Sequence, residues 1–288
     1  MILSGKNIIL TGGSQGLGKE IAKKFLQNGA FVAICARDDI ILKEAYDELL
    51  QYKSDEQQLL IGKTDISNNS EVEEFVLLCL KTFKKIDILV NNAGIHGSKN
   101  TIDEEKFDFD GWISAININL IGTLNMCHAV VPYLKQNKSG KIINLSGGGA
   151  TSPMPGMSAY AASKAAVVRL TETIALELKQ FKIDVNAVAP GAMNTRLLND
   201  VLSNGRGKVT EEYYQKALEQ RKNGGTPPSL AAELCVYLAS DESNGITGKL
   251  ISAVWDDWKN LHNNLDKLDS DIYTLRRIVP EDRDMCFN

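Results

Sequence analysis

The sequence has few of the residues that hold small or metal-dependent proteins together. Its five cysteines are scattered and contain no CxxC pair: Cys35, Cys79, Cys127, Cys235 and Cys286. This pattern argues against a disulfide framework or a zinc knuckle, and it predicts a reducing compartment, which we take to be the cytoplasm. The chain of 288 residues needs no such staple, because a chain of that length buries roughly three quarters of its unfolded surface on folding.

An excess of basic charge and a long apolar run are also absent. The sequence has 32 Lys and Arg against 36 Asp and Glu, and no basic patch suggests a nucleic-acid partner. No window approaches the roughly eighteen apolar residues of a membrane helix, and the N-terminus does not read as a signal peptide. With 43% hydrophobic and 24% charged residues, the chain is expected to be a soluble globular protein without a membrane partner.

Short apolar runs alternate with longer stretches of helical period along most of the chain. The runs that predict buried strands cover 7–11, 31–36, 58–62, 86–92, 141–146 and 182–190. The helical stretches cover 16–29, 39–52, 69–83, about 109–136 and 158–180, and another begins near Ser229. Continuous apolar strands separated by helices are typical of a parallel sheet covered on both faces. Right-handed crossovers then predict an α/β fold, a three-layer doubly wound parallel sheet.

This alternation continues to about residue 252 without a break in composition, which predicts a single domain over residues 1–252. Within it, residues 195–228 depart from the rhythm and are interpreted as a mobile or helical insertion near the substrate, because loops of this length are usually functional lids or disordered. Residues 253–288 form a C-terminal extension that is too apolar in patches for a solvated tail. We expect the extension to pack on the domain, where it could cap the substrate pocket, or on a neighbouring subunit.

A glycine-rich turn follows the first predicted strand and leads directly into the first helix. Gly12, Gly16 and Gly18 permit a tight turn, a close approach of the backbone to a pyrophosphate, and close packing of helix on strand. The helix N-terminus adds free N–H groups and a partial positive charge. A glycine-rich loop without a ligand is the alternative, but the position between strand and helix favours a dinucleotide site.

The end of the second predicted strand indicates which dinucleotide is bound. An acidic residue there would hydrogen-bond the ribose 2′-hydroxyl and select NAD. The sequence instead has Ala36, which does not repel a 2′-phosphate, followed by Arg37, whose guanidinium is suited to binding one. An ordinary surface arginine is the alternative. NADP is therefore predicted in preference to NAD.

A tyrosine and a lysine open the helix predicted over 158–180. Tyr160 and Lys164 stand at positions i and i+4 and therefore share one helix face. A free tyrosine has a pKa near 10 and is a poor acid–base catalyst at neutral pH, but a nearby ammonium group together with an oxidised nicotinamide stabilises its phenolate. This spacing alone is common, so its weight comes from the surrounding motifs.

Together these motifs resemble those of the short-chain dehydrogenase/reductase family, in its short single-domain branch. The matching segments are TGGSQGLG (11–18), Asp65–Ile66, NNAG (91–94), ININLIGT (116–123), YAASK (160–164) and PGAMNT (190–195). They occur in the family's order and spacing over roughly residues 4–252. The resemblance implies a Rossmann fold and an NAD(P)-dependent oxidoreductase that interconverts a secondary alcohol and a ketone by hydride transfer.

The resemblance also implies roles for individual residues. Tyr160 would be the general acid–base, Lys164 would lower its pKa and hold the nicotinamide ribose, and Asn119 would hold a water in a proton relay. The expected cofactor-binding residues are Gly12, Ser14, Gln15, Gly16, Leu17, Gly18, Arg37, Asp65, Ile66, Asn92, Ala93, Gly94, Tyr160, Lys164, Pro190, Gly191, Met193 and Thr195. No metal site is expected.

One residue that the resemblance predicts is missing. The family carries a serine thirteen positions before its tyrosine, where it hydrogen-bonds the substrate oxygen, and that position is Gly147 here. Ser146 is one residue too early, and side chains in a strand alternate between faces. Three interpretations stay open. A register shift in the glycines brings Ser146 into the site, Thr151 or Ser152 takes its place, or substrate and water make the contact.

Two alternatives to the oxidoreductase remain: a dinucleotide-binding sensor or partner protein with little catalysis, which Gly147 would favour, and a lyase or epimerase that uses bound cofactor transiently. The expected substrate is a small carbonyl or alcohol compound, with His96, Met154, Met157 and residues of 195–225 as pocket-facing candidates. The long helices at 109–136 and 158–180 resemble those through which family members associate. A homodimer or homotetramer is therefore predicted.

Overall fold

The computed structural model describes residues 1–204 and 209–285. Part of the predicted insertion, residues 205–208, and Cys286 lie outside the described residues. The other four cysteines, Cys35, Cys79, Cys127 and Cys235, are buried free thiols.

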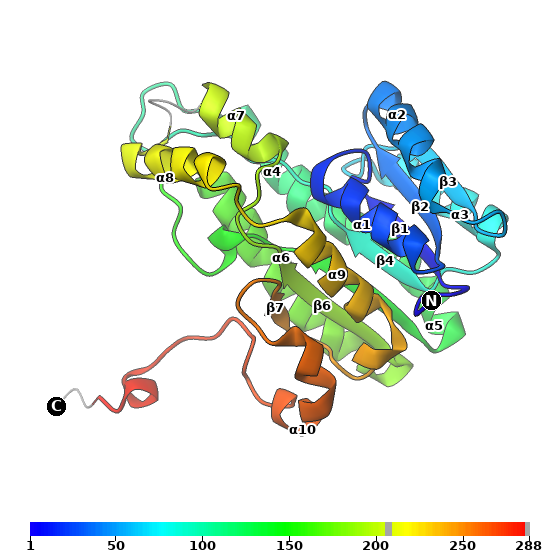
Figure 1. The fold of residues 1–288 in the computed structure, drawn as a ribbon. Coiled ribbons are helices and arrows are strands. Elements are labelled where there is room, and N and C mark those ends of the chain that lie inside the picture. The colour runs from blue at the N-terminus through cyan, green and yellow to red at the C-terminus, as the bar shows by residue number, and fades with distance from the viewer. Residues whose placement is uncertain (205–208, 286–288) are drawn as a thin grey trace.

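A single parallel sheet forms the centre of the molecule (Figure 1), with the strand order β3-β2-β1-β4-β5-β6-β7. Its strands are β1 (Asn7–Thr11), β2 (Phe31–Ala36), β3 (Leu59–Lys63), β4 (Ile88–Asn91), β5 (Gly140–Leu145), β6 (Ile183–Ala189) and β7 (Leu250–Ser252). Every neighbouring pair is parallel. The predicted doubly wound sheet is confirmed. The strand β7 was not predicted, because three residues are too few to show a periodic pattern.

Helices cover both faces of the sheet. They are α1 (Gly16–Gln27), α2 (Asp39–Leu49), α3 (Asn69–Phe83), α4 (Phe109–Ile116), α5 (Gly122–Asn137), α6 (Ser158–Leu178), α7 (Arg196–Asn204), α8 (Glu211–Lys222), α9 (Pro228–Ala239) and α10 (Leu265–Leu268). One apolar cluster contains buried residues of α1, α2 and α9, and the other contains those of α3, α5 and α6. The two clusters lie on opposite faces of the strands, which explains why β1 is buried along its whole length.

The side of the sheet to which successive strands are added changes between β1 and β4. Strands β2 and β3 follow on one side of β1, whereas β4 to β7 follow on the other. The carboxyl ends of these two strands therefore form a crevice at the point where the strand order switches, which is where ligands bind in open α/β sheets.

The stretch predicted as one helix over 109–136 is α4 and α5 joined by a π-helical turn, Asn117–Ile121. This run, Phe109–Asn137, is long and apolar enough by composition to cross a membrane, but 44% of its most apolar window is buried inside the protein. Met126, Cys127 and Val130 of α5 belong to the core between helix and sheet. One face of α5 therefore packs against the sheet, while the other side of the run is exposed.

The described part of the insertion at 195–228 contains two helices, α7 and α8. Leu198 and Val201 of α7, Val209 just before α8 and Ala217 of α8 lie in a third apolar cluster, and Met157 from the loop before α6 is buried with them. Tyr160 packs against the same cluster. The insertion therefore lies beside the residues at the start of α6.

The C-terminal extension has two parts. Trp258, Leu261 and Leu268 are buried in the core cluster that contains α9, and the Leu250 N–H of β7 donates to the Tyr273 carbonyl at 2.7 Å. The first part therefore packs on the domain and lies along the sheet edge. Beyond Leu275 the chain leaves the body of the molecule as an arm (Figure 1), and residues 276–285 are mostly exposed.

Candidate active site

The glycine turn after β1 leaves no space for side chains. Gly12 has a φ of +66°, and a Cβ on it would lie 2.8 Å from the Ala93 Cα. A Cβ on Gly18 would overlap the Gly12 carbonyl oxygen. The N-cap residue of α1, Gln15, makes no side-chain capping hydrogen bond, so the first N–H groups of the helix remain available to an anion. This turn fits the pyrophosphate of a dinucleotide.

The segment after β4 braces this turn from the other side of the crevice. The Asn92 amide donates to the carbonyls of Thr11 and Gly12, both at 3.0 Å, and the Thr11 hydroxyl accepts from the backbone N–H groups of Asn92 and Ala93. Asn91 is different, because its amide donates to the Asn144 Oδ1 of β5 at 2.9 Å. Asn91 ties strands together, while Asn92 shapes the turn.

Arg37 and Asp38 follow β2 at the rim of the crevice. Asp38 caps α2, because its carboxylate accepts from the backbone N–H groups of Ile40 and Ile41. It is therefore engaged by its own helix. Arg37 is exposed, and no hydrogen bond or ion pair joins its guanidinium to another residue in the described part of the chain.

The turn after β3 carries the residues expected to contact adenine. Asp65 accepts from the Ser67 N–H and hydroxyl at 2.9 and 2.6 Å, so its carboxylate stabilises its own turn. Ile66 is buried and lies so close to Gly122 that a Cβ there would be 2.6 Å from the Ile66 Cδ1. The side chain therefore joins this turn to α5.

The loop after β6 closes the crevice on a third side. A Cβ on Gly16 would lie 3.7 Å from the Thr195 Cγ2, so this loop faces the glycine turn. Met193 pairs with Gly225 in an isolated antiparallel bridge, and the Thr226 N–H donates to the Ala192 carbonyl at 2.7 Å. The expected cofactor residues of the loop are thus held beside those of the turn.

The predicted catalytic residues come together where α6 crosses the π-helical turn. Asn119 is fully buried. Its amide donates to the Ser163 hydroxyl at 2.9 Å, and its carbonyl oxygen accepts from the Ile95 N–H at 2.8 Å. Lys164 donates to the Leu145 carbonyl at 2.7 Å, and its Nζ lies 5.9 Å from the centre of the Tyr160 ring. A π-helical turn widens the helix by one residue and is frequent at functional sites.

Burial alone works against catalysis at this tyrosine. It raises the pKa of Tyr160 to about 12, with a smaller contribution from Tyr213, and it lowers the pKa of Lys164 to about 8. Both shifts favour the neutral forms of the two side chains. An ionised tyrosine therefore needs further positive charge beside it, which an oxidised nicotinamide would bring.

Gly147 lies directly under the Tyr160 hydroxyl. A Cβ on Gly147 would collide with the Tyr160 hydroxyl oxygen and would lie 3.0 Å from its Cζ. Ser146 continues the strand, since its N–H donates to the Val188 carbonyl. Its hydroxyl is buried and has no hydrogen-bond partner. A register shift that opens Ser146 to the crevice is not observed.

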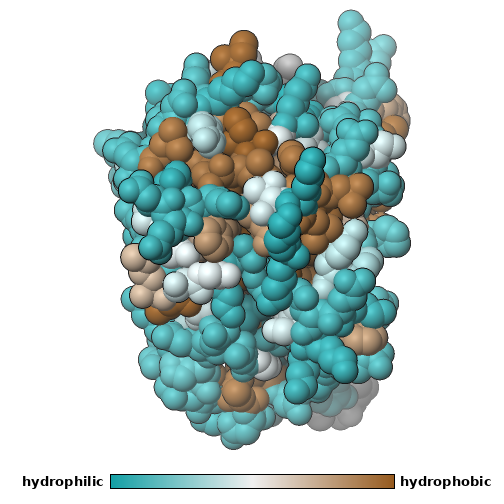
Figure 2. Space-filling view, turned by 90° about the vertical axis from the view of Figure 1, so that its right-hand side faces the viewer, coloured by the Kyte–Doolittle hydropathy of each residue, from teal (hydrophilic) through white to brown (hydrophobic). Residues whose placement is uncertain are grey.

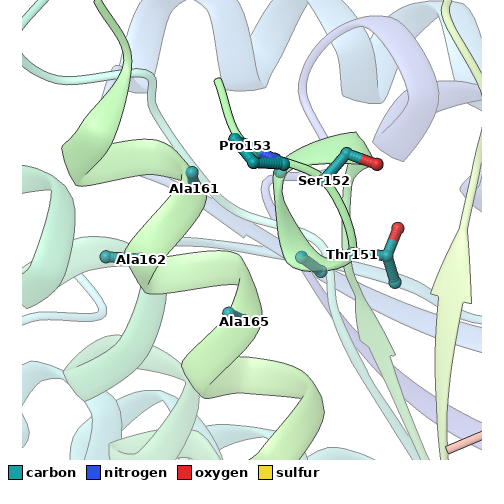
Figure 3. A pocket seen from close by; sticks show the side chains of 8 residues that line it. Thr151, Ser152, Pro153, Ala161, Ala162 and Ala165 are labelled. Atoms are coloured by element: carbon teal, nitrogen blue, oxygen red, sulfur yellow. The ribbon is translucent and has the colours of Figure 1, made fainter. Parts of the chain in front are cut away.

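The other two candidates for the missing serine, Thr151 and Ser152, line a pocket of about 340 Å³ with Ala161, Ala162 and Ala165. In Figure 3 their hydroxyl groups point away from these alanines. At about 100° per residue, the alanines lie about 100–200° around α6 from Tyr160. Neither Tyr160 nor Lys164 lines this pocket.

His96, which was expected from the sequence only to face the substrate pocket, is a direct neighbour of Tyr160. The ring of His96 lies 4.9 Å from the Tyr160 ring, nearly perpendicular to it at 86°. The other two pocket candidates, Met154 and Met157, pack in the apolar cluster with Tyr160.

Ser163, whose hydroxyl accepts from the Asn119 amide, was not singled out from the sequence, although it lies within the YAASK motif. Among the described residues no group of His, Cys, Asp or Glu is placed to hold a metal ion.

Comparison with known proteins agrees with this geometry. A family model described as short chain dehydrogenase matches residues 6–205. The 3-oxoacyl-[acyl-carrier-protein] reductase of Thermotoga maritima is 36% identical over 87% of this chain and 97% of its own length. An NAD⁺-bound xylitol dehydrogenase structure matches with a TM-score of 0.79 and 25% identity, over 88% of this chain and 98% of its own. A 7α-hydroxysteroid dehydrogenase in complex with NADH and 7-oxo glycochenodeoxycholic acid matches with a TM-score of 0.75 and 29% identity, over 87% and 93%.

Proposed function

Because this chain belongs to the short-chain dehydrogenase family, we propose that it is an NADP-dependent oxidoreductase that interconverts a secondary alcohol and a ketone. The observation that carries this proposal is the convergence of Tyr160, Lys164 and Asn119 at the crevice between β1 and β4. The glycine turn that fits a pyrophosphate opens onto the same crevice.

In this proposal the nicotinamide, when bound, supplies or accepts the hydride. Tyr160 gives a proton to the substrate oxygen during reduction and removes it during oxidation. Lys164 favours the phenolate through its charge, and its hydrogen bond to Leu145 holds it in place. Asn119 fixes the backbone at Ile95 and the Ser163 side chain, which keeps the floor of the site rigid.

The preference for NADP rests on the turn after β2. Arg37 is exposed, and Asp38 is engaged as the cap of α2, so the rim presents a cation to the adenosine ribose. A guanidinium binds a 2′-phosphate through charge-assisted hydrogen bonds. NAD⁺ and NADH are bound in two of the similar structures. They are the cofactors of those proteins, and our preference for NADP in this chain comes from Arg37 and Asp38.

Two measurements test the proposed function. Fluorescence titration with NADPH and NADH should show tighter binding of NADPH. Assays with acetoacetyl-CoA and with 7-oxo glycochenodeoxycholic acid should then show oxidation of NADPH by at least one ketone. Tyr160→Phe should bind NADPH as the wild type does and lose about 10²–10⁴-fold in kcat, because only the acid–base hydroxyl is removed.

The results separate the remaining functions. Binding of NADPH without turnover of any ketone would favour a sensor or partner protein. Product formation without net consumption of cofactor would favour a lyase or epimerase. A fully active Tyr160→Phe enzyme would overturn the mechanism, and failure to bind either dinucleotide would overturn the oxidoreductase as a whole.

We also propose that the protein is a homo-oligomer of the cytoplasm. Apolar side chains exposed on α4, the π-helical turn, α5 and α6 are Phe109, Ile113, Ile121, Leu124 and Leu176. Separately from these residues, Figure 2, which views the right-hand side of the molecule in Figure 1, shows an area where hydrophobic side chains gather among hydrophilic ones. Exposed apolar areas of this kind mark association surfaces. We propose further that the exposed arm at 276–285 packs on a neighbouring subunit.

A further inference from the structure

The position of Gly147 defines what the active site lacks. The Tyr160 hydroxyl lies over this glycine so closely that no Cβ fits beneath it. Ser146 precedes Gly147 in extended backbone, where successive side chains point to opposite sides, and Thr151 and Ser152 line a pocket that Tyr160 does not line. A substrate oxygen that meets Tyr160 therefore needs its second polar contact from another side of the tyrosine ring.

His96 occupies that other side. Its imidazole packs nearly perpendicular to the Tyr160 ring, with the ring centres 4.9 Å apart. Only 7% of the residue is exposed, and its Nδ1 is buried without a hydrogen-bond partner. A buried polar atom without a partner is costly and rare in folded proteins. Such an atom beside a reacting group is suited to a ligand.

The backbone around His96 is fixed by the catalytic residues themselves. The side chain of Asn119 accepts from the Ile95 N–H at 2.8 Å and donates to the Ile95 carbonyl at 2.9 Å. A Cβ on Gly94 would lie 3.1 Å from the Asn119 Oδ1 and 3.5 Å from the Lys164 Nζ. Residues 94–96 therefore run across the catalytic group, and Asn119 determines where the imidazole is held.

The surroundings keep this imidazole uncharged. The pKa of His96 is lowered to about 4, mainly by burial and in addition by the charges of Lys99 and Lys164, while Asp200 acts in the opposite direction. A neutral imidazole carries one N–H donor and one acceptor nitrogen. It is thus able to hydrogen-bond a ketone oxygen without competing with Tyr160 as a stronger acid.

We propose that His96 is the second hydrogen-bonding group at the reacting oxygen, where its neutral imidazole takes the role that related enzymes give to the serine replaced here by Gly147. This inference rests on the proposed ketone reduction at Tyr160. The imidazole donates to the substrate oxygen while Tyr160 transfers the proton. His96 also determines which ketones are accepted, because its ring forms one wall beside the tyrosine.

The experiment compares His96→Phe and His96→Asn in the full-length protein. Phenylalanine keeps a ring against Tyr160 but has no nitrogen, whereas asparagine keeps a polar donor. We expect His96→Phe to lower kcat for acetoacetyl-CoA or 7-oxo glycochenodeoxycholic acid about tenfold to a hundredfold, with unchanged affinity for NADPH and unchanged melting temperature. His96→Asn should recover part of the lost kcat.

His262→Phe and His262→Asn are the matched controls. His262 also lies against a tyrosine, Tyr237, with ring centres 6.3 Å apart, but in the C-terminal extension. These variants should retain wild-type kcat.

The remaining outcomes would contradict either the role of His96 or the proposed function. Equal kcat of wild type and His96→Phe would overturn the role of His96 while leaving the proposed function intact. Equal loss of NADPH affinity and melting temperature in both His96 variants would show a purely structural role and would also overturn it. A wild-type protein that reduces neither ketone with NADPH would remove the proposed function, and this inference with it.

Discussion

A glycine at position 147 follows from where the Tyr160 ring lies. The ring is in contact with His96 on one side and with the apolar cluster of α7 and α8 on another, and we expect these contacts to oppose a shift of its hydroxyl away from an added side chain. Gly148, the next residue, has no atom within 4 Å of an added Cβ. The two neighbouring glycines therefore differ in the space that they leave for a side chain, and substitutions at the two positions should have different effects.

Restoring the family's serine at this position should harm the enzyme. We expect Gly147→Ser to lower kcat by at least about tenfold, because the serine displaces the Tyr160 hydroxyl from its place and an overpacked site costs about 1–3 kcal/mol. Gly148→Ser should leave kcat unchanged. Steady-state kinetics with NADPH and the best ketone checks both. A Gly147→Ser enzyme faster than the wild type would mean that the tyrosine adjusts and the serine functions normally.

Lys164 makes the cofactor-free protein sensitive to pH. Burial lowers the pKa of Lys164 from 10.5 to about 8, so between these values the unfolded chain binds more protons than the folded one, and stability rises with pH. Below pH 8 the penalty of the buried charge is fully present.

Lys164→Met removes this penalty. The melting temperature of the variant relative to wild type should therefore be highest near pH 7 and should decline from pH 8 towards pH 10. Thermal unfolding over this range measures the trend. A constant difference between the two proteins would show that burial does not shift this lysine.

At the scale of elements, we expect the turn between β2 and α2 to decide which dinucleotide is preferred. Arg37 is exposed there, and Asp38 is held as a helix cap. Arg37→Asp should weaken NADPH binding about tenfold to a hundredfold, because it replaces a charge-assisted contact with a repulsive charge, and should change NADH binding much less. Lys43→Asp on the exposed face of α2 is the control. Equal losses for NADPH and NADH would show that Arg37 does not contact a 2′-phosphate.

The elements themselves were largely predictable from the sequence. Strands such as β1 and β2 are buried on both faces of a parallel sheet and therefore appear as continuous apolar runs. The π-helical turn at Asn117–Ile121 was not predicted, because it keeps the apolar pattern of the helices on either side. The strand β7 is too short to show a pattern, and its place depends on pairing with β6.

The candidate site was predictable where function depends on local spacing and less so where it depends on packing. Tyr160 and Lys164 share a helix face by their spacing alone, and the glycine turn follows a strand directly. The collision over Gly147 and the contact of His96 with Tyr160 depend on residues brought together from the segments after β4 and β5 and from α6. Local sequence patterns do not encode such contacts, because each contact forms only when the sheet and its helices are packed.

At the scale of the whole molecule, the two faces of the sheet differ in what covers them. The C-terminal extension adds Trp258, Leu261 and Leu268 to the side that carries α9. On the other side, α5 leaves Leu124 42% exposed while its opposite face fills the core. A helix that is apolar on both faces needs a second apolar partner. We expect that partner to be a second copy of this chain.

Leu124→Asp tests this expectation, because a carboxylate buried between two identical surfaces meets its own copy and is desolvated. Light scattering should show a dimer or tetramer for the wild type and a shift towards monomer for Leu124→Asp. Ile40→Asp is the control on α2, where Ile40 is 72% exposed and lies on the other face of the sheet; it should leave the molecular mass unchanged. A wild-type protein that stays monomeric at every concentration would exclude self-association, and Leu124 would then be an ordinary exposed side chain.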